Sequence, residues 1–89
     1  MTKKTNPQPA KSLRDADIKA AIWKNESENG PFPSVTFGRT YTDDKTGEVK
    51  DSDSFSGSQL LRLARLADKA YGVQAKLRQQ WREENGDEA

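Results

Sequence analysis

The segment Ser58-Gln59-Leu60-Leu61-Arg62-Leu63-Ala64-Arg65-Leu66-Ala67-Asp68-Lys69-Ala70-Tyr71 decides the fold of this chain. At about 100° per residue its apolar side chains share one face, which is typical of an amphipathic helix. The members of that face are Leu60, Leu63, Ala64, Leu66, Ala67, Ala70 and Tyr71. Arg62, Arg65 and Lys69 share the opposite face. No other segment offers as much aliphatic surface, so the core is expected where a second layer covers this face.

The same helix is expected to continue to about Arg82. Gly72 costs about 1 kcal/mol inside a helix and is also a candidate C-cap. Val73, Leu77 and Trp81 nevertheless continue at helical spacing and close to the same phase. At 1.5 Å per residue such a helix would be roughly 36 Å long. A small sheet cannot cover that length, so Leu77 and Trp81 are expected to overhang it and to form a partner interface. The alternative is a frayed helix end whose Trp81 folds back on the domain.

Strands are expected before this helix. In residues 17–25, Ile18, Ala20 and Ile22 alternate with polar and aromatic neighbours, and Asn29-Gly30 then indicates a turn. Residues 34–42 give the clearest strand pattern, because β-branched and aromatic residues alternate with small ones. The next loop is predicted to close through a left-handed Gly47.

A third, polar strand is expected from residue 48 to about residue 55, at an edge of the sheet. The predicted fold is α+β: a three-stranded antiparallel β-meander followed by one long C-terminal α-helix (βββα). Residues 16–82 would form this single domain. Residues 1–15 are interpreted as a disordered basic N-terminal tail and residues 83–89 as an acidic disordered tail.

Composition limits the chemistry. The chain has 89 residues, 31% hydrophobic and 33% charged, with no Cys and no His. The commonest general base, the commonest metal ligand and thiolate chemistry are therefore missing, and no glycine-rich phosphate loop is present. No apolar run has the length of a membrane span. These features favour a soluble, cytoplasmic, non-enzymatic protein without a cofactor.

Charge is distributed in blocks, although the net charge is only +1. Residues 1–14 carry four basic and no acidic side chains, whereas residues 15–57 carry five basic and nine acidic ones. Residues 58–82 carry six basic side chains against Asp68, and residues 83–89 carry four acidic ones. The basic blocks are the predicted helix and the N-terminal tail.

Over half of the chain resembles a group of short bacterial proteins of unknown role. The shared pattern includes Ile22-Trp23-Lys24-Asn25-Glu26, Gly30-Pro31, Val35-Thr36-Phe37-Gly38-Arg39, Asp51-Ser52-Asp53-Ser54-Phe55 and Leu66-Ala67-Asp68. The layout of a polar sheet followed by a helix is also similar to the positive-cofactor and Whirly type of single-strand DNA binders, in which helices help to pair protomers. These resemblances imply a bacterial protein and a possible nucleic-acid ligand.

Two groups of residues are candidates for nucleic-acid binding. Arg62, Arg65, Lys69 and Lys76 form a stripe on the outer helix face, which together with the basic tail is the strongest cationic feature. Trp23 and Lys19 share a strand face, and with Arg39 and Tyr41 on the neighbouring strand they are candidates for a base-stacking platform. A solvated helix face and a Trp23 that covers the core are the structural alternatives.

The leading hypothesis is a small binding protein that contacts DNA or RNA, and it includes a homodimer formed through the C-terminal helix. The alternative is a protein–protein interaction module, an adaptor or inhibitor, that uses the acidic sheet and the overhanging helix. No metal site is predicted. Asp51 and Asp53 alternate on a strand, but charges on an edge strand are explained by the need to block edge-to-edge pairing.

Overall fold

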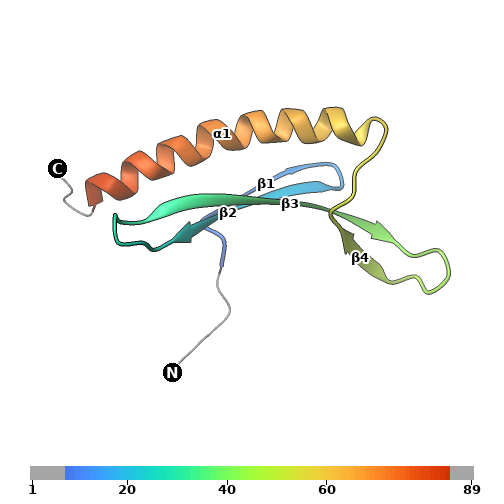
Figure 1. Cartoon of the computed structure of the whole chain (residues 1–89). Coiled ribbons are helices and arrows are strands. Elements are labelled where there is room, and N and C mark those ends of the chain that lie inside the picture. Colours follow the sequence, from blue (N-terminus) through green and yellow to red (C-terminus); the bar gives the residue numbers. More distant parts are fainter. Residues whose placement is uncertain (1–7, 85–89) are drawn as a thin grey trace, which may run out of the picture.

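The structure, a computed structural model, describes residues 8–84 and has two layers (Figure 1). The lower layer is an antiparallel sheet of four strands in the order β1-β2-β3-β4. The strands are β1 (Lys11–Asp15), β2 (Ile18–Asn25), β3 (Phe32–Thr42) and β4 (Val49–Ser52). The upper layer is one helix, α1 (Gln59–Glu84), which packs on β1, β2 and β3. The α+β class and the C-terminal helix are confirmed.

The expected number of strands was wrong, since the sheet has four strands rather than three. The additional strand, β1, lies in the segment interpreted as a disordered tail of residues 1–15. Asp15 pairs with Ile18, so only Ala16 and Asp17 connect β1 to β2. Ala16 takes the left-handed conformation with φ of 57°. Tight hairpin turns usually place Gly or Asn at such a position, and without that signal the hairpin was missed.

Strand β3 changes partner along its length. Its residues from Phe32 to Arg39 pair with β2, whereas those from Arg39 to Thr42 pair with β4. The β3–β4 hairpin therefore projects beyond the rest of the sheet (Figure 1). Gly47 closes its loop with φ of 76°, as predicted, and its amide donates to the Asp43 carbonyl at 2.7 Å. The predicted strand over residues 48–55 is shorter than expected, because it ends at Ser52.

The core lies between β2 and the centre of α1. Ile18, Ala20 and Ile22 are fully buried, as the alternation in β2 predicts. Leu66 and Ala70 cover them from the helix. Half-buried apolar side chains surround this centre: Leu13, Val35, Phe37, Phe55 and Leu63. Leu13 and Phe37 flank Ala20 on the neighbouring strands, so β1 adds Leu13 to a row of apolar side chains across the sheet.

The inward face of α1 is rotated from the predicted one. The side chains that point to the sheet are Leu63, Leu66, Ala70, Val73, Leu77 and Trp81. Leu60 and Tyr71, both expected in the core, are 54% and 71% exposed. The reason is the length of the helix. It continues through Gly72 to Glu84, so one straight stripe of inward side chains must contact the sheet along both halves of the helix. Trp81 fixes the phase of that stripe.

The expected overhang of Leu77 and Trp81 was also wrong. Trp81 is only 6% exposed, and the Lys24 ammonium lies 5.2 Å from the centre of its ring. Leu77 is half-buried. The 8 residues of β2 and 11 residues of β3 make a hairpin long enough to reach under the end of the helix. These two residues therefore stabilise the domain itself and are not available as exposed interface anchors.

The proposed boundaries of the domain shift at both ends. Residues 11–15 belong to the sheet, and Glu83 and Glu84 belong to α1. The remainder of the two predicted tails, residues 1–7 and 85–89, lies outside the described residues. Among the described residues, no helix combines the length and the hydropathy needed to cross a membrane.

The turn at Ala16 gives a test of the new strand. An Ala in the left-handed conformation costs about 1–2 kcal/mol, and a Gly at the same position avoids this cost. Gly loses more backbone freedom on folding than Ala does, which offsets about 0.5–1 kcal/mol of that gain. Ala16→Gly is therefore expected to raise the free energy of unfolding by about 0.5 kcal/mol in urea denaturation. The control Ala75→Gly, at an exposed position of α1, should lower it by about 1 kcal/mol. A loss of stability in Ala16→Gly as well as in Ala75→Gly would contradict the left-handed conformation of Ala16.

Burial of Trp81 gives a second test. Removing its ring should lower the free energy of unfolding by about 3–5 kcal/mol, because a cavity opens over β2 and β3. Trp81→Ala would be compared by urea denaturation with Val49→Ala, whose side chain is 72% exposed and should change stability by about 0.5 kcal/mol or less. Equal effects of the two changes would show that Trp81 does not belong to the core.

Candidate nucleic-acid interface

One side of the molecule collects cations from α1 and β1. Arg62, Arg65, Lys69 and Lys76, the stripe predicted from the sequence, lie on the flank of the helix that is next to β1. Arg14 of β1 joins them, because Arg14, Arg65 and Lys69 line one shallow hollow of ≈ 290 Å³ with Asp15 and Leu66. We refer to these residues as the cationic flank: Arg14, Arg62, Arg65, Lys69 and Lys76.

The cationic flank is exposed and only partly neutralised. Arg62 is half-exposed and pairs with Asp17 of the β1–β2 turn at 3.7 Å. Arg14 donates from a guanidinium nitrogen to the Ala16 carbonyl at 3.5 Å. Within residues 8–84, the side chains of Arg14, Arg65, Lys69 and Lys76 make no ion pair. The positive charges of Arg65, Lys69 and Lys76 thus face the solvent on one side of α1, and Arg14 lies beside them at the edge of the sheet, next to Asp15.

Helical spacing sets the distances along this flank. Arg65 and Lys69 are one turn apart, about 6 Å at 1.5 Å per residue, and Lys76 follows about 10.5 Å further on. All three are exposed. Long flexible side chains on such a row can reach successive phosphates of a nucleic-acid strand, because the charged heads extend well beyond the helix axis. Lys11, at the other end of β1, is also exposed.

Trp23 and Lys19 lie elsewhere, on the face of the sheet that α1 does not cover. The Trp23 indole nitrogen donates to the Thr36 hydroxyl at 2.8 Å, which holds the ring against β3. Lys19 pairs with Asp51 of β4 at 3.5 Å. Together they line an open hollow of ≈ 750 Å³ that has Ala21 and Gly38 on its walls. This hollow contains Asp51 and Asp53 as well, so the two carboxylates outweigh the single positive charge of Lys19.

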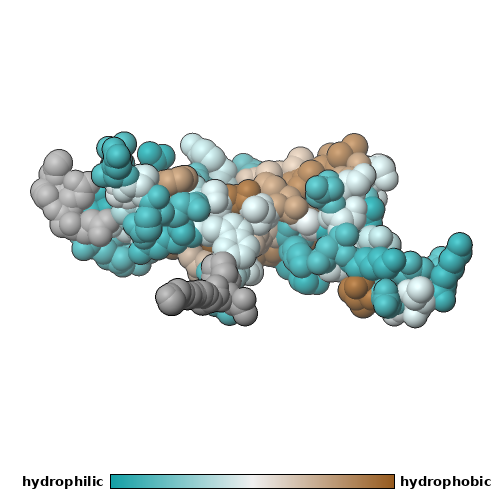
Figure 2. Space-filling view, turned by 60° about the horizontal axis from the view of Figure 1, so that its bottom comes forward, coloured by the Kyte–Doolittle hydropathy of each residue, from teal (hydrophilic) through white to brown (hydrophobic). Residues whose placement is uncertain are grey.

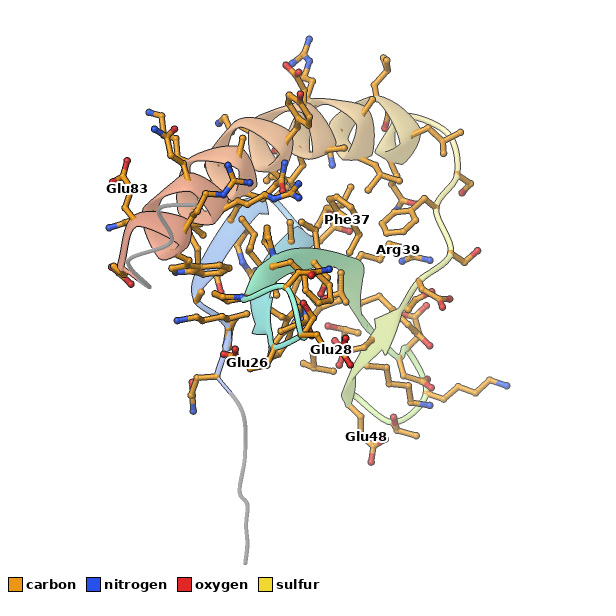
Figure 3. The ribbon with its side chains drawn as sticks, turned by 60° about the vertical axis from the view of Figure 1, so that its left-hand side comes forward. Glu26, Glu28, Phe37, Arg39, Glu48 and Glu83 are labelled. Atoms are coloured by element: carbon orange, nitrogen blue, oxygen red, sulfur yellow. The ribbon has the colours of Figure 1, made fainter. Side chains whose placement is uncertain are left out.

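Arg39 does not join Trp23. It is paired with Ile18 and therefore points to the helix side of the sheet, as Figure 3 shows together with Phe37. Its Nε donates to the Ser54 carbonyl at 2.6 Å, and its guanidinium lies 5.5 Å from the centre of the Tyr41 ring. Arg39 thus fastens the segment that leads from β4 to α1. The platform of four residues is divided between the two faces of the sheet.

The acidic side chains of the β3–β4 hairpin are used locally. Asp43 accepts from the Lys45 amide at 2.8 Å and pairs with the Lys50 ammonium at 2.9 Å. The Lys50 contact and, after it, the Lys45 amide lower the pKa of Asp43 below its ordinary value. Among the described residues, no three carboxylates come together as a group that could hold a metal ion.

Arg14 is a residue of the cationic flank that the sequence did not predict. Its segment, Lys11-Ser12-Leu13-Arg14-Asp15, has one apolar residue and was assigned to the tail. The available signal was the alternation of Leu13 with polar neighbours directly before a strong strand. Because β1 pairs with β2, the backbone of Arg14 is held at the edge of the sheet opposite Lys19, where the residue borders the hollow next to α1.

Comparisons with protein-family models, with curated proteins and with solved structures gave no match. The geometry of the cationic flank and the chemistry of its side chains are therefore the features that bear on function.

Lowering the pH tests the hairpin contact. Because its pKa is lower in the folded chain, the Asp43 carboxylate contributes stability above its ordinary pKa, and this contribution is lost as the pH falls through the lowered value. Lys50→Met should move the Asp43 titration midpoint upward in a carboxyl carbon NMR titration. Lys45→Met should leave it unchanged, because Lys45 acts through its backbone amide. An unchanged midpoint in Lys50→Met would exclude the pair as the cause.

Proposed function

We propose that this chain is a small, non-enzymatic nucleic-acid-binding protein that holds phosphates with its cationic flank. The observation that carries the proposal is the hollow shared by Arg14, Arg65 and Lys69. Cations from a strand and from a helix meet there, so the positive surface does not depend on one amphipathic helix alone. Ordinary solvated helix faces lack such a contribution from a second element.

The chemistry of the flank fits a phosphate backbone. Arg binds phosphate oxygens through two parallel N–H donors, and Lys acts as a mobile point charge. Neither residue type reads a base from this position, so binding without strong sequence preference is expected. Contact with several phosphates releases counterions, which makes the affinity fall steeply with salt.

Trp23 adds a second, weaker element to this proposal. Its ring is oriented by Thr36 and half-buried, so one base at most would stack on it. The open face that contains Trp23 adjoins β1, where Ser12 lines the same hollow. A strand held by Arg14 at the edge of the sheet can therefore continue onto this face.

The protein–protein alternative loses the overhanging helix on which it was based. The acidic hairpin remains exposed, since Asp44, Glu48 and Asp51 all face the solvent. Exposed apolar side chains do occur on α1, but at its N-terminal half.

Fluorescence anisotropy with labelled single- and double-stranded oligonucleotides tests the proposal. Affinity should fall with salt with a slope of about −0.7 to −0.9 per phosphate contact. Neutralising one contact, as in Lys69→Gln, should weaken binding and reduce the slope by about one contact. The triple variant Arg14→Gln, Arg65→Gln, Lys69→Gln should reduce affinity by at least about 100-fold at low salt.

The matched control is Lys45→Gln, which removes the same charge from the tip of the distant hairpin. It should change affinity only slightly, because Lys45 lies far from the flank and affects binding only through net charge. Equal losses of affinity in Lys45→Gln and Lys69→Gln would show that net charge attracts the nucleic acid and that the flank is not a defined site. No binding of either oligonucleotide at low salt would refute the proposal.

A further inference from the structure

The first half of α1 carries large apolar side chains that the domain leaves uncovered. Leu60, Leu61 and Tyr71 are 54%, 68% and 71% exposed. Ala64 is exposed between them. Figure 2 shows hydrophobic residues gathered over the end of the molecule where α1 begins, whereas hydrophilic residues dominate the rest of this view. We refer to Leu60, Leu61, Ala64 and Tyr71 as the apolar stripe.

The apolar stripe is continuous and distinct from the cationic flank. At about 100° per residue, Leu60, Ala64 and Tyr71 fall within about 40° of one another, and Leu61 borders them. The cations lie on the side of the helix next to β1, and Arg62 and Arg65 border the stripe at Leu61. Contiguous apolar residues on one exposed helix face mark an interaction surface more often than solitary exposed residues do.

We propose that the apolar stripe packs against the same stripe of a second copy, with the two helices antiparallel. An isologous contact around a two-fold axis needs a surface that complements itself. When Leu61 lies level with Tyr71 of the second copy, Ala64 lies level with its Asp68. A large side chain then meets a large one near each end, and the small Ala64 lets the helices approach near the centre.

Charge favours the antiparallel arrangement. Asp68 borders the apolar stripe and makes no ion pair within the described chain. In the antiparallel pair, Arg65 lies one residue away from the level of Asp68 of the second copy, on the same side of the interface. In a parallel pair, Asp68 would lie level with Asp68, and Arg65 would lie level with Arg65 on the opposite side of the interface, so neither would meet an opposite charge. Opposite charges therefore come together only when the helices run in opposite directions.

The two-fold axis also relates the cationic flanks. Because stripe and flank lie on different sides of α1, an antiparallel pair turns both flanks to the same face of the dimer. Two such surfaces would bind one strand more tightly than one surface, through effective concentration. The dimer itself is independent of nucleic acid and is tested without it.

Sedimentation equilibrium of the full chain without nucleic acid should give twice the 10.0 kDa of one chain, with a concentration-dependent monomer fraction. Leu61→Glu should raise the dissociation constant of the dimer by at least about tenfold, because it buries a charge in the interface. The control Val49→Glu, which changes a similarly exposed apolar residue on the β3–β4 hairpin, should leave it unchanged. A monomer at all concentrations, or equal effects of both variants, would overturn the proposal.

Charge exchange tests the register without removing apolar surface. Arg65→Asp and Asp68→Arg should each weaken the dimer, since each places like charges together across the interface. The double variant should recover most of the loss, because the pair is rebuilt in reverse. Additive losses in the double variant would contradict the proposed register.

A distance measurement decides the direction of the helices. The chain has no Cys, so Gln79→Cys can carry a single nitroxide label on the exposed side of α1. In the proposed register the two labelled positions are separated by about 39 Å along the helix axes, from 1.5 Å per residue. Parallel helices would bring them to about 10 Å. Electron–electron double resonance should report the long distance, and a short one would refute the antiparallel pair.

Discussion

The contact between one stripe of α1 and the centre of β2 is the constraint on which the rest of the structure depends. Ile18, Ala20 and Ile22 of β2 and Leu66 and Ala70 of α1 are the buried residues at this contact, and the half-buried apolar side chains pack around them. Few large side chains take part, so each is needed in a domain of this size. The rotation of α1 about its own axis, which this contact sets, determines where the charged side chains of the helix lie on the surface.

Rotation of the helix explains how one element carries two different surfaces. Trp81 and Leu66 hold the inward side, and this leaves the apolar stripe on one flank and the cations on the other. A rotation by one residue position would bury Leu60 and expose Leu63. It would also turn the arginines away from β1. The packing of the core therefore also determines where both surfaces lie on α1.

Much of this arrangement could be predicted from periodicity. The alternation in β2 and β3 and the 3.6-residue period of α1 are strong, and the four helical cations follow directly from that period. β1 could not be predicted, because Leu13 is its only apolar residue and the turn at Ala16 lacks Gly. Burial of Trp81 could not be predicted either, because it depends on how far the β2–β3 hairpin extends, which is a tertiary property.

The exchange of partners along β3 has a consequence for engineering. From Arg39 onward the strand is held by four paired residues of β4, by the turn around Asp43 and by the Thr40 amide, which donates to the Asp17 carbonyl at 3.0 Å, and none of the buried core residues lies in the loop at the tip of the hairpin. The tip at Lys45 is thus mechanically separate from the helix and from both of its surfaces. An inserted tag or fluorophore there would report on the protein without obstructing either one, and its linker could be lengthened at small entropic cost.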